Sequence, residues 1–191
     1  MIYKDLEDRY NIKNDYVLKF FIKRVLATFS KELNINKIYN ELKSQNIKIS
    51  KDSLYNFYSY LDNIYLISNL SNFWSQIKWI KKTYLIDVSF ANLVWNDDLW
   101  KRFENFVYLE IKKKYKDIFF LRKNYEINFY IPTKQKYIQV VYSLNYENVE
   151  KETKYLAKQK WEKILLYFEK EDNLIIPDWI KLIDFSDFIF H

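Results

Sequence analysis

The sequence predicts an α/β protein in two consecutive parts, a mostly helical part at about 12–86 and a layered α/β part at about 87–191. Two patterns carry this prediction. Apolar residues recur three and four positions apart in three early segments, whereas strand-like and helix-like patterns alternate later in the chain. Of the 191 residues, 49% are apolar and 20% are aromatic, so both parts have ample material for a core.

The first part is predicted to contain three helices and then a pair of strands. The helices are expected at Asp15–Ser30, after Asn34 and after Ser50, with Asn14 or Asp15 as the cap of the first. Alternating stretches at Tyr65–Leu70 and Ile77–Ile86 predict a β-hairpin. Because only a short turn separates the second helix from the third, these elements make a winged helix-turn-helix domain at 12–86.

The second part is predicted to begin with a long helix and to continue through a sheet. The expected helices lie at about Asp97–Tyr115 and Glu147–Lys160, and the expected strands at Ile118–Arg122, Tyr125–Ile131, Tyr137–Tyr142, Ile164–Phe168 and Ile180–Asp184. A helix, three strands, a second helix and further strands form an α/β layer structure with a covered sheet.

Composition excludes several kinds of site. The chain has no glycine, which rules out Walker A loops and dinucleotide fingerprints, and asparagine is expected at turns that need a positive φ. It has no cysteine and a single histidine, His191, so disulfides, thiolate metal sites and histidine-dependent catalysis are excluded. We therefore expect no cofactor and no bound metal.

The sequence also bears on location. No segment approaches the roughly 18 to 20 uninterrupted apolar residues that cross a membrane. The first ten residues, MIYKDLEDRY, carry acids where a signal peptide has a basic and then an apolar stretch. We expect a cytoplasmic protein with no membrane partner.

Basic charge is concentrated in the first part, which holds 14 Lys and Arg against 8 Asp and Glu in residues 1–86, while residues 87–191 hold 17 of each. A locally basic domain suggests a polyanion partner such as duplex DNA. The candidate DNA contacts are Lys51, Tyr55 and Asn56 on the third helix, and Lys78, Lys81 and Lys82 on the hairpin. The alternative is that the winged helix is a packing or protein-interaction module.

The second part carries positions where a PD-(D/E)xK nuclease would hold its metal. Such a site needs an acid on one strand, then an acid and a lysine two apart on the next. The corresponding positions here are Glu104, Glu126, Asn128, Gln139 and Val141. Without the second acid and the lysine, we expect a nuclease-like scaffold with no cleavage activity, in which Val141 packs beside Phe129 or a helix. The alternatives are vestigial metal binding and a metal-dependent nuclease with a displaced active site.

Six segments, taken in order, carry a resemblance to a known family. They are YKDLEDRYNIKN at 3–14, KTYLIDVSF at 82–90, FENFVYLEI at 103–111, YEINFYI at 125–131, IQVVYSL at 138–144 and KETKYLAK at 151–158. In this order they resemble the C-terminal region of a family of prokaryotic AAA+-like ATPases. In that family an ATPase domain is followed by a winged helix and a nuclease-like domain of uncharacterised function.

The resemblance implies what the chain does and what it lacks. Residues 1–11 would be a remnant of the junction between ATPase and winged helix, and 87–191 a degenerate restriction-endonuclease-like domain. Asn128 stands where the family usually carries Asp. The implied function is a non-catalytic DNA- or partner-binding region of an archaeal or bacterial ATPase-type protein, whose partner would be an ATPase domain or subunit. A purely structural oligomerisation module remains an alternative.

Overall fold

The computed structural model describes residues 2–75 and 81–190, and the chain divides into two compact units. Unit 1 comprises Met1–Asn69 and Thr83–Asp97, and unit 2 comprises Leu70–Lys82 and Asp98–His191. The chain therefore passes between the units inside a pair of strands and again at residues 97–98, whereas the sequence suggested one passage near residue 87.

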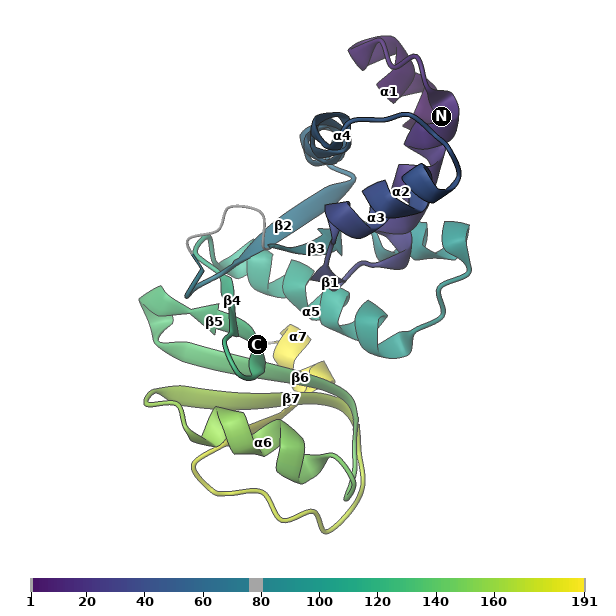
Figure 1. Ribbon diagram of the computed structural model, residues 1–191. Coiled ribbons are helices and arrows are strands. Elements are labelled where there is room, and N and C mark those ends of the chain that lie inside the picture. Colours follow the sequence, from purple (N-terminus) through teal and green to yellow (C-terminus); the bar gives the residue numbers. More distant parts are fainter. Residues whose placement is uncertain (1, 76–80, 191) are drawn as a thin grey trace. The chain divides into compact units, whose positions relative to one another are not determined.

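Unit 1 is mostly helical. Its helices are α1 (Ile2–Tyr10), α2 (Asp15–Ala27), α3 (Ile35–Ser44), α4 (Lys51–Asn63) and the 3-10 helix η1 (Val88–Val94) (Figure 1). The side chains of Asn14, Asn34 and Ser50 accept hydrogen bonds from backbone amides three residues on, at 2.9 to 3.1 Å. These caps satisfy amides that a helix start leaves without partners, and they confirm the predicted beginnings of α2, α3 and α4. The sequence did not predict α1 or η1.

The core of unit 1 is built from one face of each helix. In α2 the buried side chains are Val17, Leu18, Phe21, Ile22, Val25 and Leu26, at the spacing predicted from the sequence. They pack in one cluster with Ile38 and Leu42 of α3 and with Leu54, Phe57 and Leu61 of α4. The helices are thus held together by apolar contacts among their inward faces.

The strands form one mixed sheet in the order β1-β3-β2-β4-β5-β6-β7-β8 over the described residues. Their bounds are β1 Lys31–Glu32, β2 Ile67–Asn72, β3 Lys81–Leu85, β4 Phe119–Arg122, β5 Glu126–Ile131, β6 Lys136–Leu144, β7 Glu162–Lys170 and β8 Lys181–Asp184. The pairs β4–β5 and β5–β6 are antiparallel, whereas β2–β4, β6–β7 and β7–β8 are parallel. The predicted mixed α/β class is confirmed.

Unit 2 adds three helices to its strands, α5 (Leu99–Lys114), α6 (Val149–Ala157) and the short α7 (Phe185–Phe190) (Figure 1). Side chains alternate along a strand, so Ile138 and Val141 of β6 lie on opposite faces. Ile138 pairs with Phe129, whose ring lies 6.2 Å from that of Tyr108 on α5. Val141 is fully buried in a cluster with Leu156 of α6. Helices α5 and α6 therefore cover opposite faces, and Val141 packs against a helix as predicted.

Two properties of the backbone complete the description. Seven non-glycine residues have a positive φ among those described, and Asn11, Asn46 and Asn173 are three of them. Asparagine tolerates this region best, so its use at these turns was predicted, whereas Tyr65 and Trp95 in the same region were not. None of the helices over residues 2–75 and 81–190 is long and apolar enough to cross a membrane.

Candidate functional site

A buried lysine lies between two carboxylates in unit 2. The Nζ atom of Lys82, on β3, is 2.8 Å from an Oε atom of Glu104 on α5 and 2.5 Å from one of Glu126 on β5. The Lys82 side chain is only 3% exposed, whereas those of Glu104 and Glu126 are 16% and 36% exposed. A buried ammonium requires such partners, because moving a charged group from water into a protein interior costs on the order of several kcal/mol.

The charge state of Lys82 follows from two opposing effects. Burial by itself disfavours the charged form and so lowers the pKa of Lys82. The negative charges of Glu104 and Glu126, with their hydrogen bonds, outweigh burial and raise the pKa of Lys82 above its ordinary value of 10.5. The lysine is therefore an ammonium at neutral pH. Its Nζ atom also lies 5.7 Å from the centroid of the Phe120 ring.

Asn128 extends this polar arrangement from Glu104 to strand β6. Its Nδ2 donates to the second carboxylate oxygen of Glu104 at 2.9 Å, and its Oδ1 accepts from the backbone amide of Val140 at 2.9 Å. The register of β5 against β4 shifts by one residue between the pairs Leu121–Ile127 and Phe119–Tyr130. Such a bulge re-aims a side chain, and here the Asn128 amide bonds a backbone group of the neighbouring strand.

Gln139 continues the network to helix α6. Its Oε1 accepts from the backbone amide of Asn128 at 3.3 Å, and its Nε2 donates to an Oε atom of Glu152 at 2.7 Å. The other Glu152 oxygen lies 3.6 Å from Nζ of the exposed Lys151. A continuous polar network therefore runs from α5 through β3, β5 and β6 to α6.

The structure brings together Glu104, Glu126, Asn128 and Gln139, four of the positions that the sequence suggested for a vestigial nuclease site. Val141 lies outside this network, in the apolar core on the α6 side. Two members were missed, Lys82 and Glu152. Lys82 precedes a run of buried residues in β3, and a lysine beside such a run is a signal that could have suggested an internal role.

The two carboxylates of the site could attract a cation, but the Lys82 ammonium already pairs with both of them. The Lys82 ammonium occupies the space between two carboxylates that a divalent cation would need. Asn128 presents its Nδ2 donor to Glu104, and its Oδ1 is bonded to the backbone amide of Val140, so it offers no free oxygen ligand to a metal. Over the described ranges, no three His, Cys, Asp or Glu side chains are grouped so that they could hold a metal ion. What the network does in this arrangement is bind α5 to three strands.

The residues suggested for DNA contact differ in how exposed their side chains are. In unit 1, Lys51 and Asn56 of α4 are exposed, Tyr55 is half-buried, and Lys51 Nζ lies 5.3 Å from the ring centroid of Tyr39. Lys78 falls outside the described residues and Lys81 is half-buried. The Lys82 ammonium is buried and bound by two carboxylates, which corrects the expectation that it contacts DNA phosphates from the hairpin.

A hollow beside α4 gathers further basic residues. It is lined by the turn between α3 and α4, and its lining residues are Tyr39, Lys43, Asn46, Ile47, Lys48, Ile49 and Ser50. Lys43 and Lys48 are exposed and were not singled out from the sequence, because isolated lysines in a turn carry no pattern. Together with Lys51 they bring three ammonium groups to the start of α4.

Comparison with known proteins gives one informative match. The chain is 35% identical over 167 residues to a protein of Methanocaldococcus jannaschii that is described only as uncharacterized. The match covers 83% of this chain but 38% of that relative, so the chain spans well under half of the relative's length. No family model matches the chain. No solved structure matches it either.

Proposed function

We propose that the chain is a non-catalytic binding region, which recognises duplex DNA through a winged helix in unit 1 and carries a degenerate nuclease-like domain in unit 2. The observation that carries this proposal is the Lys82 ammonium seated between Glu104 and Glu126. A metal-dependent nuclease requires carboxylates that are open to Mg²⁺ and to the scissile phosphate. Here an internal cation satisfies both carboxylates, which favours a structural role.

The DNA-binding half of the proposal rests on α3, α4 and the turn between them. A helix-turn-helix places the first residues of its second helix in the major groove, and α4 presents exposed Lys51 and Asn56 near its start. Lys43 and Lys48 flank the same helix start, where the backbone amides also favour anions. Phosphate contacts by lysines are insensitive to sequence, so we infer weak binding with little sequence preference.

A longer parent protein is part of the same proposal. The M. jannaschii relative extends well beyond the matched region, since only 38% of its length is covered. This is compatible with the order suggested by the six sequence segments, an ATPase domain followed by a winged helix and a nuclease-like domain. The DNA-binding region would then position an ATPase on its substrate. An oligomerisation module is the second candidate, and the neighbouring exposed side chains of Leu93 and Trp95 in unit 1 favour an apolar partner.

The test uses fluorescence anisotropy to measure binding to a labelled duplex of random sequence over a range of salt concentrations. Wild-type protein should bind at low salt, and the logarithm of affinity should fall linearly with the logarithm of salt concentration. Replacing Lys48 and Lys51 with Ala should reduce the slope by about 0.9 for each lost phosphate contact. Lys160→Ala, which removes an exposed lysine of unit 2, is the matched control and should leave the slope unchanged. No binding at low salt would remove the DNA proposal and leave the oligomerisation module.

A further inference from the structure

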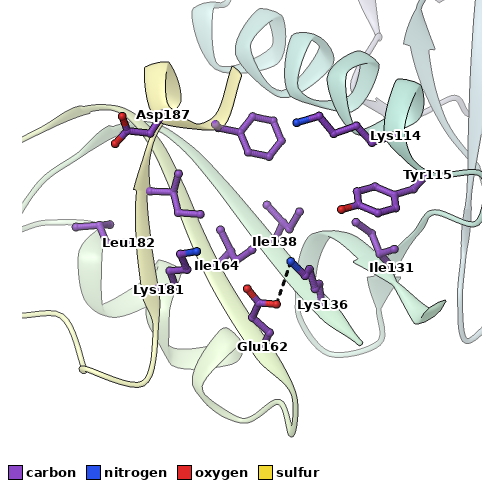
Figure 2. A pocket seen from close by; sticks show the side chains of 12 residues that line it. Lys114, Tyr115, Ile131, Lys136, Ile138, Glu162, Ile164, Lys181, Leu182 and Asp187 are labelled. Carbon is purple, nitrogen blue, oxygen red and sulfur yellow. Dashed lines mark ion pairs between the residues drawn. The ribbon is translucent and has the colours of Figure 1, made fainter. Parts of the chain in front are cut away.

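A second site in unit 2 is unrelated to the Lys82 network. It is a pocket of about 500 Å³ at the ends where β6, β7 and β8 begin, and Figure 2 shows its lining side chains. The last turn of α5 contributes Lys114 and is followed by Tyr115, while α7 contributes Asp187 and Phe188. A volume of this size lies within the range of roughly 300 to 1,000 Å³ typical of small-molecule sites.

The floor of the pocket is apolar and well packed. Ile131, Ile138 and Ile164 line it, although each is at most 5% exposed. Ile138 of β6 pairs in register with Ile164 of β7, so both side chains point to the same face of the sheet. Tyr115 and Phe188 add aromatic rings at the sides. A floor fixed by the sheet is preformed, which lowers the entropic cost of binding.

Three lysines from three different elements surround this floor, namely Lys114, Lys136 and Lys181. Lys136 Nζ lies 3.1 Å from a Glu162 oxygen, and this pair is drawn as a dashed line in Figure 2. Within the described part of the chain, neither Lys114 nor Lys181 forms an ion pair, and Lys114 Nζ lies 5.6 Å from the ring centroid of Phe188. With Glu162 and Asp187 as the acids of the pocket, one positive charge is left uncompensated.

We propose that this pocket binds a small amphipathic anion, an aliphatic or aromatic body that carries one phosphate or carboxylate group. The apolar body would cover the isoleucine floor, and the anionic group would lie at the rim against Lys181 and Lys114. Burying the body displaces water from apolar surface, and charge-assisted hydrogen bonds from the exposed ammonium groups of Lys181 and Lys114 to the anionic group add to this. Asp187 and Glu162 disfavour polyphosphates, because the additional phosphate groups would face a carboxylate.

The proposal can be tested by NMR on protein labelled at its isoleucine methyl groups. Phenyl phosphate and benzoate are the two probes, and because they share a phenyl body they separate phosphate from carboxylate recognition. Either probe, at concentrations up to about 10 mM, should shift the methyl signals of Ile131, Ile138, Ile164 and Ile183, with Ile22 and Ile38 of unit 1 unaffected. A fragment-sized ligand is expected to bind with a Kd near 1 mM.

Two variants and a control assign the anion contact. Lys181→Gln should weaken binding at least about fivefold, because it removes the unpaired ammonium, and Glu162→Gln should tighten it by releasing Lys136 from its ion pair. Lys163 is the residue next to Glu162 on β7, but it lies over the Trp179 ring and does not line the pocket. Lys163→Gln is therefore the control and should leave the affinity unchanged. Dispersed methyl signals will show that each variant is folded. Absence of saturable shifts with both probes, or shifts that are indifferent to Lys181→Gln, would overturn the proposal.

Discussion

Replacing Lys82 with Met should destabilise the protein strongly, because it removes a buried charge and leaves its partners in place. Breaking a buried ion pair by truncating one partner costs about 3–5 kcal/mol. Lys82 serves two carboxylates, yet the Glu126 side chain is 36% exposed and water can solvate it. We therefore expect the lower end, a loss of about 3 kcal/mol. With a urea m value of about 2 kcal/mol per molar, the unfolding midpoint should fall by about 1.5 M.

Urea unfolding followed by circular dichroism measures this loss, and the neighbouring lysine provides the control. Lys81 is half-buried, and Lys81→Met should move the midpoint far less. Adding Glu104→Gln and Glu126→Gln to Lys82→Met should restore at least half of the lost stability, because no uncompensated charge then remains. A Lys82→Met midpoint no lower than that of Lys81→Met would refute the ion-pair reasoning. A triple variant as unstable as Lys82→Met would assign the loss to packing.

Three further outcomes follow, two from the same network and the third from Lys82 together with Tyr58, a buried side chain of α4 outside the network. In Lys82→Met, Mg²⁺ or Mn²⁺ should raise the melting temperature, because a cation can replace the ammonium, whereas wild type should not respond. Asn128→Asp should lower stability at neutral pH by about 1–3 kcal/mol, since it places a second carboxylate beside Glu104; its destabilisation should shrink as pH falls and the new acid is protonated. Alkali should unfold the protein. Burial raises the pKa of Tyr58, and the carboxylates raise that of Lys82 against the effect of burial. The stability from both groups is complete below about pH 10 and is lost as pH rises further, which urea midpoints between about pH 8 and pH 11 would measure.

The helices and strands were largely predictable because their signals are local. Helix caps at Asn14, Asn34 and Ser50 act over three residues, and the apolar spacing of α2 is complete within its own sequence. Strand β6 extends two residues beyond its predicted end because Ser143 and Leu144 continue the pairing with β7. The short α7 was missed because its six residues, FSDFIF, carry no helical period long enough to detect.

The polar network was predictable only in part, because its contacts are distant in sequence. Asn128 and Gln139 come from neighbouring strands, and a strand pattern places them near each other. Lys82 meets Glu104 and Glu126 across 22 and 44 positions, respectively, and comes from a strand whose neighbours are set by the whole sheet. Lys81 and Lys82 stand side by side at the start of β3, and from the sequence they resemble an exposed basic pair. In the structure the Lys82 side chain is buried.

We propose that the region binds DNA without cutting it, and one gel measurement tests both parts. Purified protein is incubated with supercoiled plasmid and Mn²⁺, and each sample is run before and after protease treatment. We expect retarded migration at low salt that protease reverses, because lysines contact the DNA phosphates. The plasmid should stay supercoiled, because the Lys82 ammonium already pairs with the carboxylates of Glu104 and Glu126. Nicked or linear plasmid produced by wild-type protein and lost in Glu104→Ala would contradict it.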